Sequence, residues 1–255
     1  STPQAEQAAQ ALGYYNTRIR PQVDGPDEAP VLVLNVQLGE PVRYNRVNIR
    51  ILGPGEGTRE FDLPSSERLR PGEQLHHGHY ESLKTLINNQ ALRYGYFSGR
   101  FSQQRVRVIP IANQSALDLV YRTGERYRLG DVVFSESPFD EDLLQRMVTF
   151  DADIPYDADL IASLNRDLLS IGYFDSVQVS APSGEAVDGV IPVKAEVRAR
   201  KPHSLGFGGG FSTDVGPRAR ATWTQHWLNS RGHSRGTEME VSAPRQQLSG
   251  YYQIP

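Results

Sequence analysis

The chain of 255 residues contains no cysteine, and this absence removes several kinds of chemistry at once. Without cysteine there is no disulfide framework, no thiolate zinc site and no cysteine nucleophile. Long apolar runs are also missing, because no stretch of about 18 apolar residues occurs that could form a transmembrane helix. The N-terminus lacks a basic stretch followed by an apolar core, so we expect no signal peptide in the sequence.

The chain also lacks a large excess of charge of either sign. Its formal net charge is −3, which gives no electrostatic reason to expect nucleic acid as a partner, since that requires clustered Lys and Arg. Aromatic residues make up 9% and charged residues 22% of the chain, values that are typical of a folded protein. The length exceeds the usual size of one domain, so we expect two or three modules.

Motifs for catalysis or for a cofactor are missing. No Gly-x-Ser-x-Gly elbow is present, and no Ser, His and Asp share a recognisable context for nucleophilic catalysis. The run Gly206–Gly210 superficially resembles a phosphate-binding loop, but it lacks the following Lys-Ser/Thr and no helical pattern follows it. We therefore predict that the chain is not an enzyme and binds no cofactor.

Two groups of possible metal ligands have simpler explanations. His76, His77 and His79 stand without a clear carboxylate just before a predicted helix, which favours a solvated loop over a metal site. The acidic run Asp151–Asp159 lacks the Gly at the sixth position and the Glu at the twelfth that an EF-hand loop requires. A helix N-terminus that gathers acidic residues, with Asp157 as its N-cap, is the alternative that we favour. We predict no metal site.

A three-residue pattern, glycine followed by two aromatic residues, recurs at intervals of about 80 residues and indicates a tandem repeat. Each copy ends an apolar stretch of helical period, where glycine is the expected left-handed stop. Each copy also precedes a stretch of strand period. The three copies are Gly13-Tyr14-Tyr15, Gly95-Tyr96-Phe97 and Gly172-Tyr173-Phe174.

The helical stretches place apolar residues three and four positions apart, on one face of a helix. These are Leu83, Leu86, Ile87 and Ala91 before the second copy, and Ile161, Leu164, Leu168 and Ile171 before the third. The stretches that follow alternate apolar with polar residues, as in a sheet covered on one side. The apolar positions are Val106, Val108, Leu117, Leu119 and Tyr121 in one copy, and Val177, Val179, Ile191, Val193, Ala195 and Val197 in the other.

A second phrase, Gly-Glu-x-x-Arg followed by two apolar strand positions, recurs at one common offset. It begins at Gly39, ahead of Val47 and Ile49, and again at Gly124, ahead of Val132 and Phe134. The sequence therefore predicts an α+β fold of tandem modules. Each module has the order β-α-α-β-β, with a three-stranded sheet covered by two helices.

The repeat predicts modules of unequal completeness. Residues 39–123 form a complete second module and residues 124–200 a complete third one. Residues 1–38 hold only the last helix of a first module, about Pro3 to Leu12, and a hairpin with Leu32, Leu34, Val36 and Leu38 on one face. Because a helix and a hairpin bury little apolar surface, we expect this first part to be poorly stable alone.

Residues 201–255 have a different character. Runs of about ten residues alternate apolar with small or charged residues, which is typical of transmembrane β-barrel strands. An ordinary antiparallel meander is the alternative. Since a barrel needs at least about eight strands, we expect the chain to be a fragment. The apolar positions are Leu205, Phe207, Phe211, Ala219, Ala221, Trp223, Trp227, Met239, Val241 and Ala243, with a turn at 214–217 between the first two runs.

Modules of this order, with Gly-Tyr-Phe at the end of the second helix, resemble POTRA domains (polypeptide-transport-associated domains). Their position ahead of a barrel resembles the outer-membrane assembly superfamily. The tail, with Gly208-Gly209-Gly210-Phe211, Trp227-Leu228-Asn229 and Gly232-His233-Ser234, is similar to the first barrel strands of the TamA family of outer-membrane assembly factors. That family has three POTRA domains, which agrees with two complete copies and one truncated copy.

The resemblance implies a location in the Gram-negative outer membrane, with the POTRA region in the periplasm and lipid around the barrel part. It implies a role in inserting or secreting β-rich client proteins, autotransporters among them. It also implies a TamB-like partner that is anchored in the inner membrane. A soluble periplasmic protein-binding scaffold without insertase function is the alternative.

Open sheet edges are the predicted binding sites. An extended segment can add to an edge strand through backbone hydrogen bonds with little demand on side chains, which suits a factor with many clients. We predict that the first hairpin strand of each complete module is this edge. Its residues are Arg105, Val106, Arg107 and Val108 in one module and Ser176, Val177, Gln178 and Val179 in the other.

The glycine-rich run Ser204–Thr213 predicts a second kind of site. Glycine packs poorly in a strand and loosens its pairing, so this strand is a candidate seam at which the barrel opens laterally. The alternative is that the glycines make room for bulky lumen residues. The seam residues are Gly206, Gly208, Gly209 and Gly210.

Overall fold

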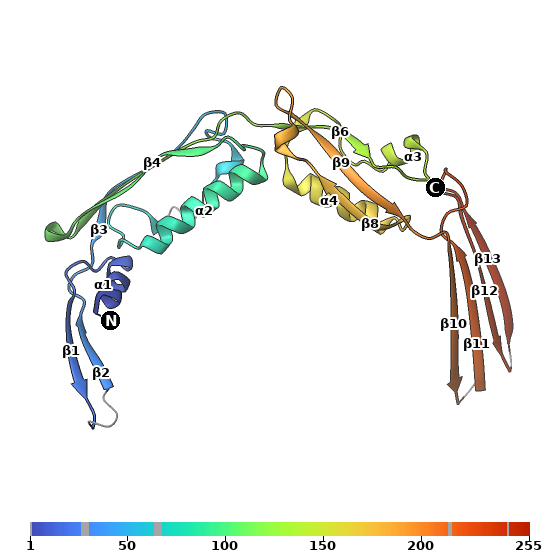
Figure 1. Cartoon of the computed structure of the whole chain (residues 1–255), viewed down its shortest axis with the longest axis horizontal. Coiled ribbons are helices and arrows are strands. Elements are labelled where there is room, and N and C mark those ends of the chain that lie inside the picture. The colour runs from blue at the N-terminus through green and yellow to red at the C-terminus, as the bar shows by residue number, and fades with distance from the viewer. Residues whose placement is uncertain (1, 27–30, 64–67, 214–215, 244) are drawn as a thin grey trace. The chain divides into compact units, whose positions relative to one another are not determined.

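Figure 1 shows the computed structural model of the chain. It describes residues 2–26, 31–63, 68–213, 216–243 and 245–255. The chain divides into two compact units, Ser1–Arg126 and Tyr127–Pro255. None of the described helices is long and apolar enough to cross a membrane.

The first unit begins with a helix and a hairpin, as predicted. Gly13 follows the helix with a φ of 90°, the left-handed stop expected from the sequence. The hairpin strands pair antiparallel, Ile19 with Val36 and Val23 with Leu32, which gathers apolar side chains on one exposed face. The elements are α1 (Thr2–Ala11), β1 (Arg18–Asp24) and β2 (Val31–Gln37).

A three-stranded mixed sheet with a long helix on one face follows (Figure 1). The central strand β5 pairs in parallel with β3 and antiparallel with β4. Leu117, Leu119 and Tyr121 of β5 are buried, as the alternation predicted, and belong to one core with Leu83 and Ile87 of the helix. The elements are β3 (Arg43–Leu52), α2 (His77–Arg93), β4 (Arg100–Ile109) and β5 (Gln114–Arg122).

This module departs from the predicted order at its first helix. In its place the described residues hold a 3₁₀ turn, Arg59–Phe61. The preceding run, Gly53-Pro54-Gly55-Glu56-Gly57, explains the difference because proline and glycine disfavour an α-helix. Phe61 nevertheless reaches the core, where its ring centroid lies 5.3 Å from that of Tyr96.

The second unit starts with a module that has both predicted helices. Its central strand β9 pairs in parallel with β6 and antiparallel with β8. A short strand, β7, adds to the start of β6, so the sheet has four strands and not the predicted three. Asp157 caps α4, as predicted, by accepting a hydrogen bond from the Asp159 N–H at 2.9 Å. The elements are β6 (Arg128–Phe134), α3 (Glu141–Gln145), β7 (Ile154–Pro155), α4 (Ala158–Ser170), β8 (Phe174–Ser180) and β9 (Val190–Ala199).

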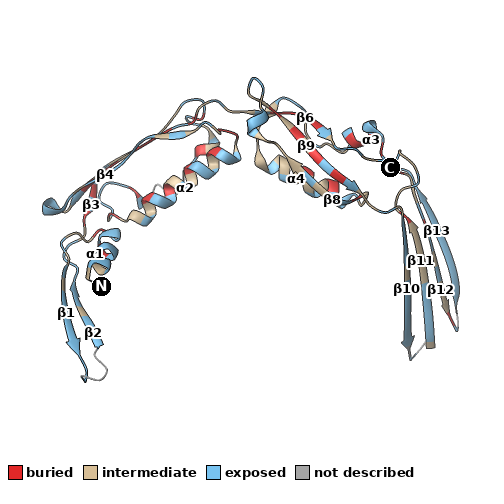
Figure 2. Ribbon diagram, viewed as in Figure 1, coloured by how far each residue is buried: buried red, intermediate tan, exposed pale blue. Residues whose placement is uncertain are grey.

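Four antiparallel strands in the order β10-β11-β12-β13 end the chain. In the described residues they form an open sheet and not a closed barrel; positions 214 and 215 of the predicted turn lie outside those residues. Cross-strand partners on one face are apolar, as in the pairs Leu205–Trp223 and Ala221–Met239. Figure 2 shows most of this sheet exposed, and Phe207 is 82% exposed. The elements are β10 (His203–Ser212), β11 (Gly216–Gln225), β12 (Ser234–Ser242) and β13 (Gln246–Gln253).

Candidate functional site

The strand β4 lies at the edge of its sheet. It carries four of the predicted site residues, Arg105, Val106, Arg107 and Val108. The N–H of Thr123, directly after β5, donates to the Leu52 carbonyl of β3 at 3.0 Å. Because backbone groups alternate in direction along a strand, the odd-numbered residues of β5 face β3 and the even-numbered residues face β4.

This alternation fixes which groups of β4 point outward. Arg105 and Arg107 are paired with even-numbered residues of β5 and therefore bond within the sheet. Val106 and Val108 are paired with odd-numbered residues, so their N–H and C=O groups point away from the sheet. The side chains alternate as well, with the two arginines exposed and the two valines packed against the core. The outward backbone groups are those that an added strand would bond.

The strand β8 lies at one edge of the second unit's mixed sheet. It carries the other predicted residues, Ser176, Val177, Gln178 and Val179. The Ser135 N–H donates to the Ala195 carbonyl at 3.0 Å, so the odd-numbered residues of β9 face β6, and their partners Val177 and Val179 point outward. The Val179 N–H already donates to Asn165 Oδ1 of α4 at 3.0 Å. This edge is therefore partly closed by the chain itself, and Val177 is its open position.

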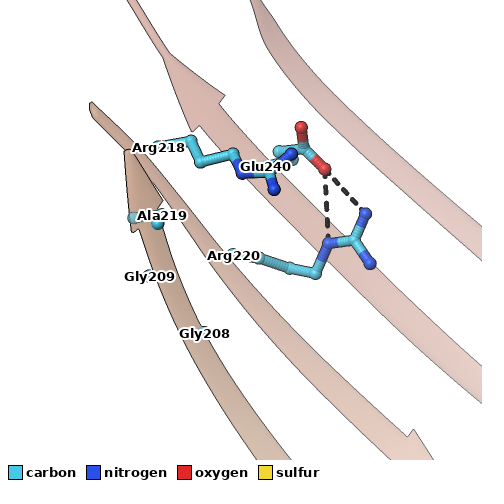
Figure 3. A pocket seen from close by; sticks show the side chains of 7 residues that line it. Gly208, Gly209, Arg218, Ala219, Arg220 and Glu240 are labelled. Carbon is cyan, nitrogen blue, oxygen red and sulfur yellow. Dashed lines mark hydrogen bonds and ion pairs between the residues drawn. The ribbon is translucent and has the colours of Figure 1, made fainter. Parts of the chain in front are cut away.

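The strand β10 is also an edge strand, and it carries the predicted seam residues Gly206, Gly208, Gly209 and Gly210. On the glycine face, Arg220 of β11 forms ion pairs with Glu240 at 2.8 Å and with Glu238 at 3.3 Å. Figure 3 shows the hollow of about 250 Å³ that three of the glycines line together with Arg218, Arg220 and Glu240. The glycines therefore line the side of the hollow that has no side chains, while the charged side chains line the rest of it.

The space beside each glycine shows whether a larger side chain would fit there, which helps to distinguish making room for bulky neighbours from the role of a lateral seam. A Cβ at Gly206 would collide with Thr222 Oγ1, and a Cβ at Gly210 would lie 3.2 Å from Arg218 Nε. Both glycines therefore make room for side chains of β11. A Cβ at Gly208 would meet nothing within 4 Å, so crowding does not require glycine there.

One contact of the second unit was missed by the sequence analysis. The sequence placed Trp227 on the apolar face beside Trp223, but β11 ends at Gln225, and the indole packs instead into the core of the preceding module. The Trp227 ring stands edge-on to the Phe139 ring at 5.8 Å between centroids. Its Nε1 donates to the Arg200 carbonyl at 2.7 Å. We call this contact between the module and the turn after β11 the tryptophan joint.

The rest of that turn strengthens the tryptophan joint. The Tyr173 hydroxyl donates to the Gly232 carbonyl at 2.8 Å, and the Asp140 N–H donates to the Ser230 carbonyl at 2.9 Å. Burial raises the pKa of Tyr173, which keeps its hydroxyl protonated as a donor. Gly232 has a φ of 75°, and a Cβ there would collide with the Tyr173 ring. Gly232 of the turn is the one local signal in the sequence for this contact, because the alternation itself continues through Trp227.

The three histidines do not lie in a solvated loop as predicted, because His77 and His79 belong to the first turn of α2, His76 directly precedes it, and all three are partly buried. His77 Nε2 lies 2.8 Å from the Tyr15 hydroxyl, a contact that ties the hairpin region to α2. The rings of His76 and His79 stack at 4.2 Å between centroids. Within the described ranges, no group of three or more His, Asp or Glu side chains is placed to hold a metal.

The topology and one family comparison together define the class of module. Residues 127–199 match the family described as "POTRA: Surface antigen variable number repeat". The order β3-β5-β4 in the first unit repeats the order β6-β9-β8 of the matched module, with the same parallel and antiparallel pairs. The chain is therefore built from POTRA modules followed by an antiparallel four-stranded sheet.

The chain is similar to a curated protein named BamA and to two solved structures of BamA. The chain is 24% identical over 214 residues to "Outer membrane protein assembly factor BamA" of Neorickettsia risticii (strain Illinois), a match that covers 81% of this chain and 28% of the relative. A crystal structure of BamA from Haemophilus ducreyi lacking POTRA domains 1–3 is 17% identical, with a TM-score of 0.56 over 78% of this chain and 37% of that one. The POTRA3–5 structure of Haemophilus influenzae BamA is 17% identical, with a TM-score of 0.41 over 76% of this chain and 80% of that one.

The chain is thus similar to outer-membrane assembly factors that carry POTRA domains, and it spans just over a quarter of the curated relative's length. The relatives' names agree with the predicted outer-membrane location of a POTRA-bearing protein and with the prediction that the chain is not an enzyme. They name BamA, whereas the sequence resembled the TamA family. The narrower TamA assignment therefore stays a proposal.

Proposed function

We propose that the chain is the periplasmic arm and the first membrane strands of an outer-membrane translocation and assembly factor. The arm binds β-rich client proteins by strand addition at its sheet edges and passes them to a barrel for insertion or secretion. In its narrower form the proposal is a TamA-type factor that handles autotransporters and works with a TamB-like partner. The similarity to BamA supports the assembly role, and co-purification with a TamB-like periplasmic region tests the narrower form.

The observation that carries the proposal is the outward backbone of Val106 at the open edge of β4. Recognition through backbone groups makes few demands on side-chain identity, as a factor with many clients needs. Arg105 and Arg107 stand exposed on either side. Charged side chains at an edge discourage pairing between copies of the protein, while the backbone remains accessible to a client.

Proline at Val106 or at Val177 tests strand addition. Each substitution removes an outward N–H without removing a bond of the internal ladder, a position at which edge strands tolerate proline. One backbone hydrogen bond contributes about 0.5–1.5 kcal/mol, so we expect the affinity for an unfolded outer-membrane client to fall about two- to twelvefold. The matched variants V106A and V177A keep the N–H and should bind nearly as the wild type does. Equal affinities of the proline and alanine variants would contradict strand addition at these edges.

The seam is tested in a protein that contains the complete barrel. Cysteines are placed in β10 and in the final barrel strand, and the chain described here contributes no competing thiol because it has no cysteine. If the barrel opens beside Gly208 and Gly209, the disulfide should stop client insertion and reduction should restore it. Undiminished insertion with the strands locked would refute the seam and favour the room-making role of the glycines.

A further inference from the structure

The strand β6, the first strand of the module at 127–199, has an outer edge that is only partly covered. β7 pairs with Arg128 and Leu129 of β6 and extends no further. Beyond a bulge, the Ser135 N–H donates toward β9, so the backbone groups of Val132 and Phe134 point the other way. Among the described residues, no strand pairs with β6 on that side from Val132 to Phe134.

A side-chain amide occupies part of this edge. Nε2 of Gln145, the last residue of α3, donates to the Val132 carbonyl at 2.9 Å. It stands where the N–H of a partner strand would bond. Gln145 is exposed, so it can leave the carbonyl without opening the core. The edge is therefore closed at this point by a single reversible hydrogen bond.

A groove of about 740 Å³ runs between β6 and α3, and its charges are of one sign. Four exposed carboxylates line it, those of Asp131, Glu136, Glu141 and Asp142, and no Lys or Arg does. In the part of the chain that the structure describes, none of the four forms an ion pair. Like charges along a cleft concentrate negative potential in it and attract a basic ligand.

A second hollow of about 340 Å³ adjoins the groove. Val133, which is 59% exposed, lines both of them, and Pro192 adds apolar surface to the second. Lys194, Glu185 and Glu196 line this hollow too, and Lys194 is paired with Glu185 at 2.6 Å. Successive side chains of a strand point to opposite faces. A strand added to β6 would therefore point one set of alternate side chains toward α3, with Glu141 and Asp142, and the other set toward the face on which Val133 and Pro192 are accessible.

We propose that the β6 edge binds extended polypeptide segments that alternate basic with apolar residues. The hydrogen bond from Gln145 to the Val132 carbonyl competes with this binding. The binding of extended segments rests on the proposed function, whereas the edge and the charge of the ligand are new. The open stretch from Val132 to Phe134 is about 10 Å long at ~3.3 Å per residue, so it accommodates about three residues of a partner strand. Membrane strands alternate in this way, as Arg218-Ala219-Arg220-Ala221 of this chain does. Unpaired membrane strands of client proteins are therefore the ligand class.

The equivalent edge in the first unit has the opposite charge. In the repeat, Arg46 and Arg50 of β3 occupy the positions of Asp131 and Ser135, and both arginines are exposed. Arg46 pairs with Asp118 at 2.7 Å. Because the β3 edge is basic, a basic segment is repelled there. The charge preference therefore belongs to the module at 127–199 and not to both modules.

The full chain is tested in detergent by fluorescence anisotropy with labelled peptides of about twelve residues, long enough to cover the edge at ~3.3 Å per residue. One peptide alternates Arg with Val, and the matched control alternates Glu with Val. The groove variant D131N/E136Q/E141Q removes three carboxylates. The control variant E56Q/D62N/E125Q removes three exposed carboxylates of the first unit.

We expect the Arg–Val peptide to bind at least about tenfold more tightly than the Glu–Val peptide, and the groove variant to bind it about fivefold more weakly, since exposed ion pairs are individually weak. The control variant should bind it as the wild type does. Q145A should bind it about threefold more tightly, because the Val132 carbonyl is then free for the peptide. Wild-type affinity in the groove variant, or a preference for the Glu–Val peptide, would overturn the proposal.

The proline variants separate this site from the proposed function. If V177P removes binding of the Arg–Val peptide and the groove variant does not, the peptide lies on β8. The proposed function then stands and the β6 site fails. If the groove variant loses binding while V106P and V177P keep it, the β6 site stands and the edges first predicted are wrong.

Discussion

Replacing Trp227 with alanine should detach the turn after β11 from the preceding POTRA module. The indole is partly buried and packs against that module's core, stands edge-on to Phe139 and donates to the Arg200 carbonyl at 2.7 Å. The substitution therefore removes an aromatic pair, a hydrogen bond and apolar burial together. The module's own residues remain, so the module should stay folded.

The size of the effect follows from these three losses. An aromatic pair contributes about 0.5–1.5 kcal/mol, and a hydrogen bond contributes a similar amount. The apolar burial of the partly exposed indole adds about 2 kcal/mol at ~25 cal/mol per Å². Since the turn relaxes after the change, we expect a net cost of about 3 kcal/mol, near the lower end for a Trp→Ala substitution in a core.

Hydrogen exchange measured by mass spectrometry gives the readout. A cost of about 3 kcal/mol corresponds to about 100-fold faster exchange of amides in residues 226–233. W227F keeps the ring and loses only the N–H donor, so it should cost about 1 kcal/mol. W223A is the control, because Trp223 stacks on His203 at 5.9 Å and lies under Arg235 at 5.3 Å, both within the terminal sheet. Unchanged exchange of residues 226–233 in W227A would refute the tryptophan joint.

Further predictions concern the first unit. Amides in residues 5–38 should exchange faster than those in 124–200, because in 5–26 and 31–38 the buried residues are Ala9 and Gly13 alone; equal protection would contradict this. Burial raises the pKa of Tyr44 to about 12, while an unfolded Tyr titrates near 10, so its stabilising effect is complete below pH 10 and is lost as the pH rises through 12. Urea unfolding between about pH 9 and pH 12 should therefore show a shallower loss of stability in Y44F than in the wild type. At pH 7 the same variant should lie within about 1 kcal/mol of the wild type, because the buried Tyr44 hydroxyl makes no hydrogen bond of good geometry, and the His76 backbone interacts with it only enough to lower its pKa against the larger effect of burial.

The sequence predicted helices and strands best where only one face of the element packs against the core. Leu117 and Leu119 alternate with polar residues because their strand packs against a helix on one side only. Gly95 and Gly172 adopt φ values of 81° and 87° after their helices, which is why glycine recurs there. The repeat itself carries this information, since each module must build the same half-covered sheet.

Contacts that depend on residues far apart in the chain could not be predicted in this way. Gln145 and Asn165 reach across to strand edges, and nothing in their local sequence distinguishes them from other exposed amides on helices. Trp227 fits the alternation of β11 by spacing alone, and only the end of that strand at Gln225 separates it. The first helix predicted for the second module is absent from residues 53–63 and 68–76 for a local reason, since the glycine- and proline-rich start of that segment was visible in the sequence, while residues 64–67 lie outside the described residues.

The charges on the polar face of the terminal sheet also govern how its strands can align. Arg220 stands directly opposite Glu240 and diagonal to Glu238. If β12 slid along β11 by one residue, every side chain of the sliding strand would turn to the other face, and Arg220 would lose both carboxylates. A slide by two residues keeps the faces and exchanges one glutamate for the other. The strands can therefore readjust their stagger in even steps without turning their apolar face inward, while odd steps are strongly disfavoured.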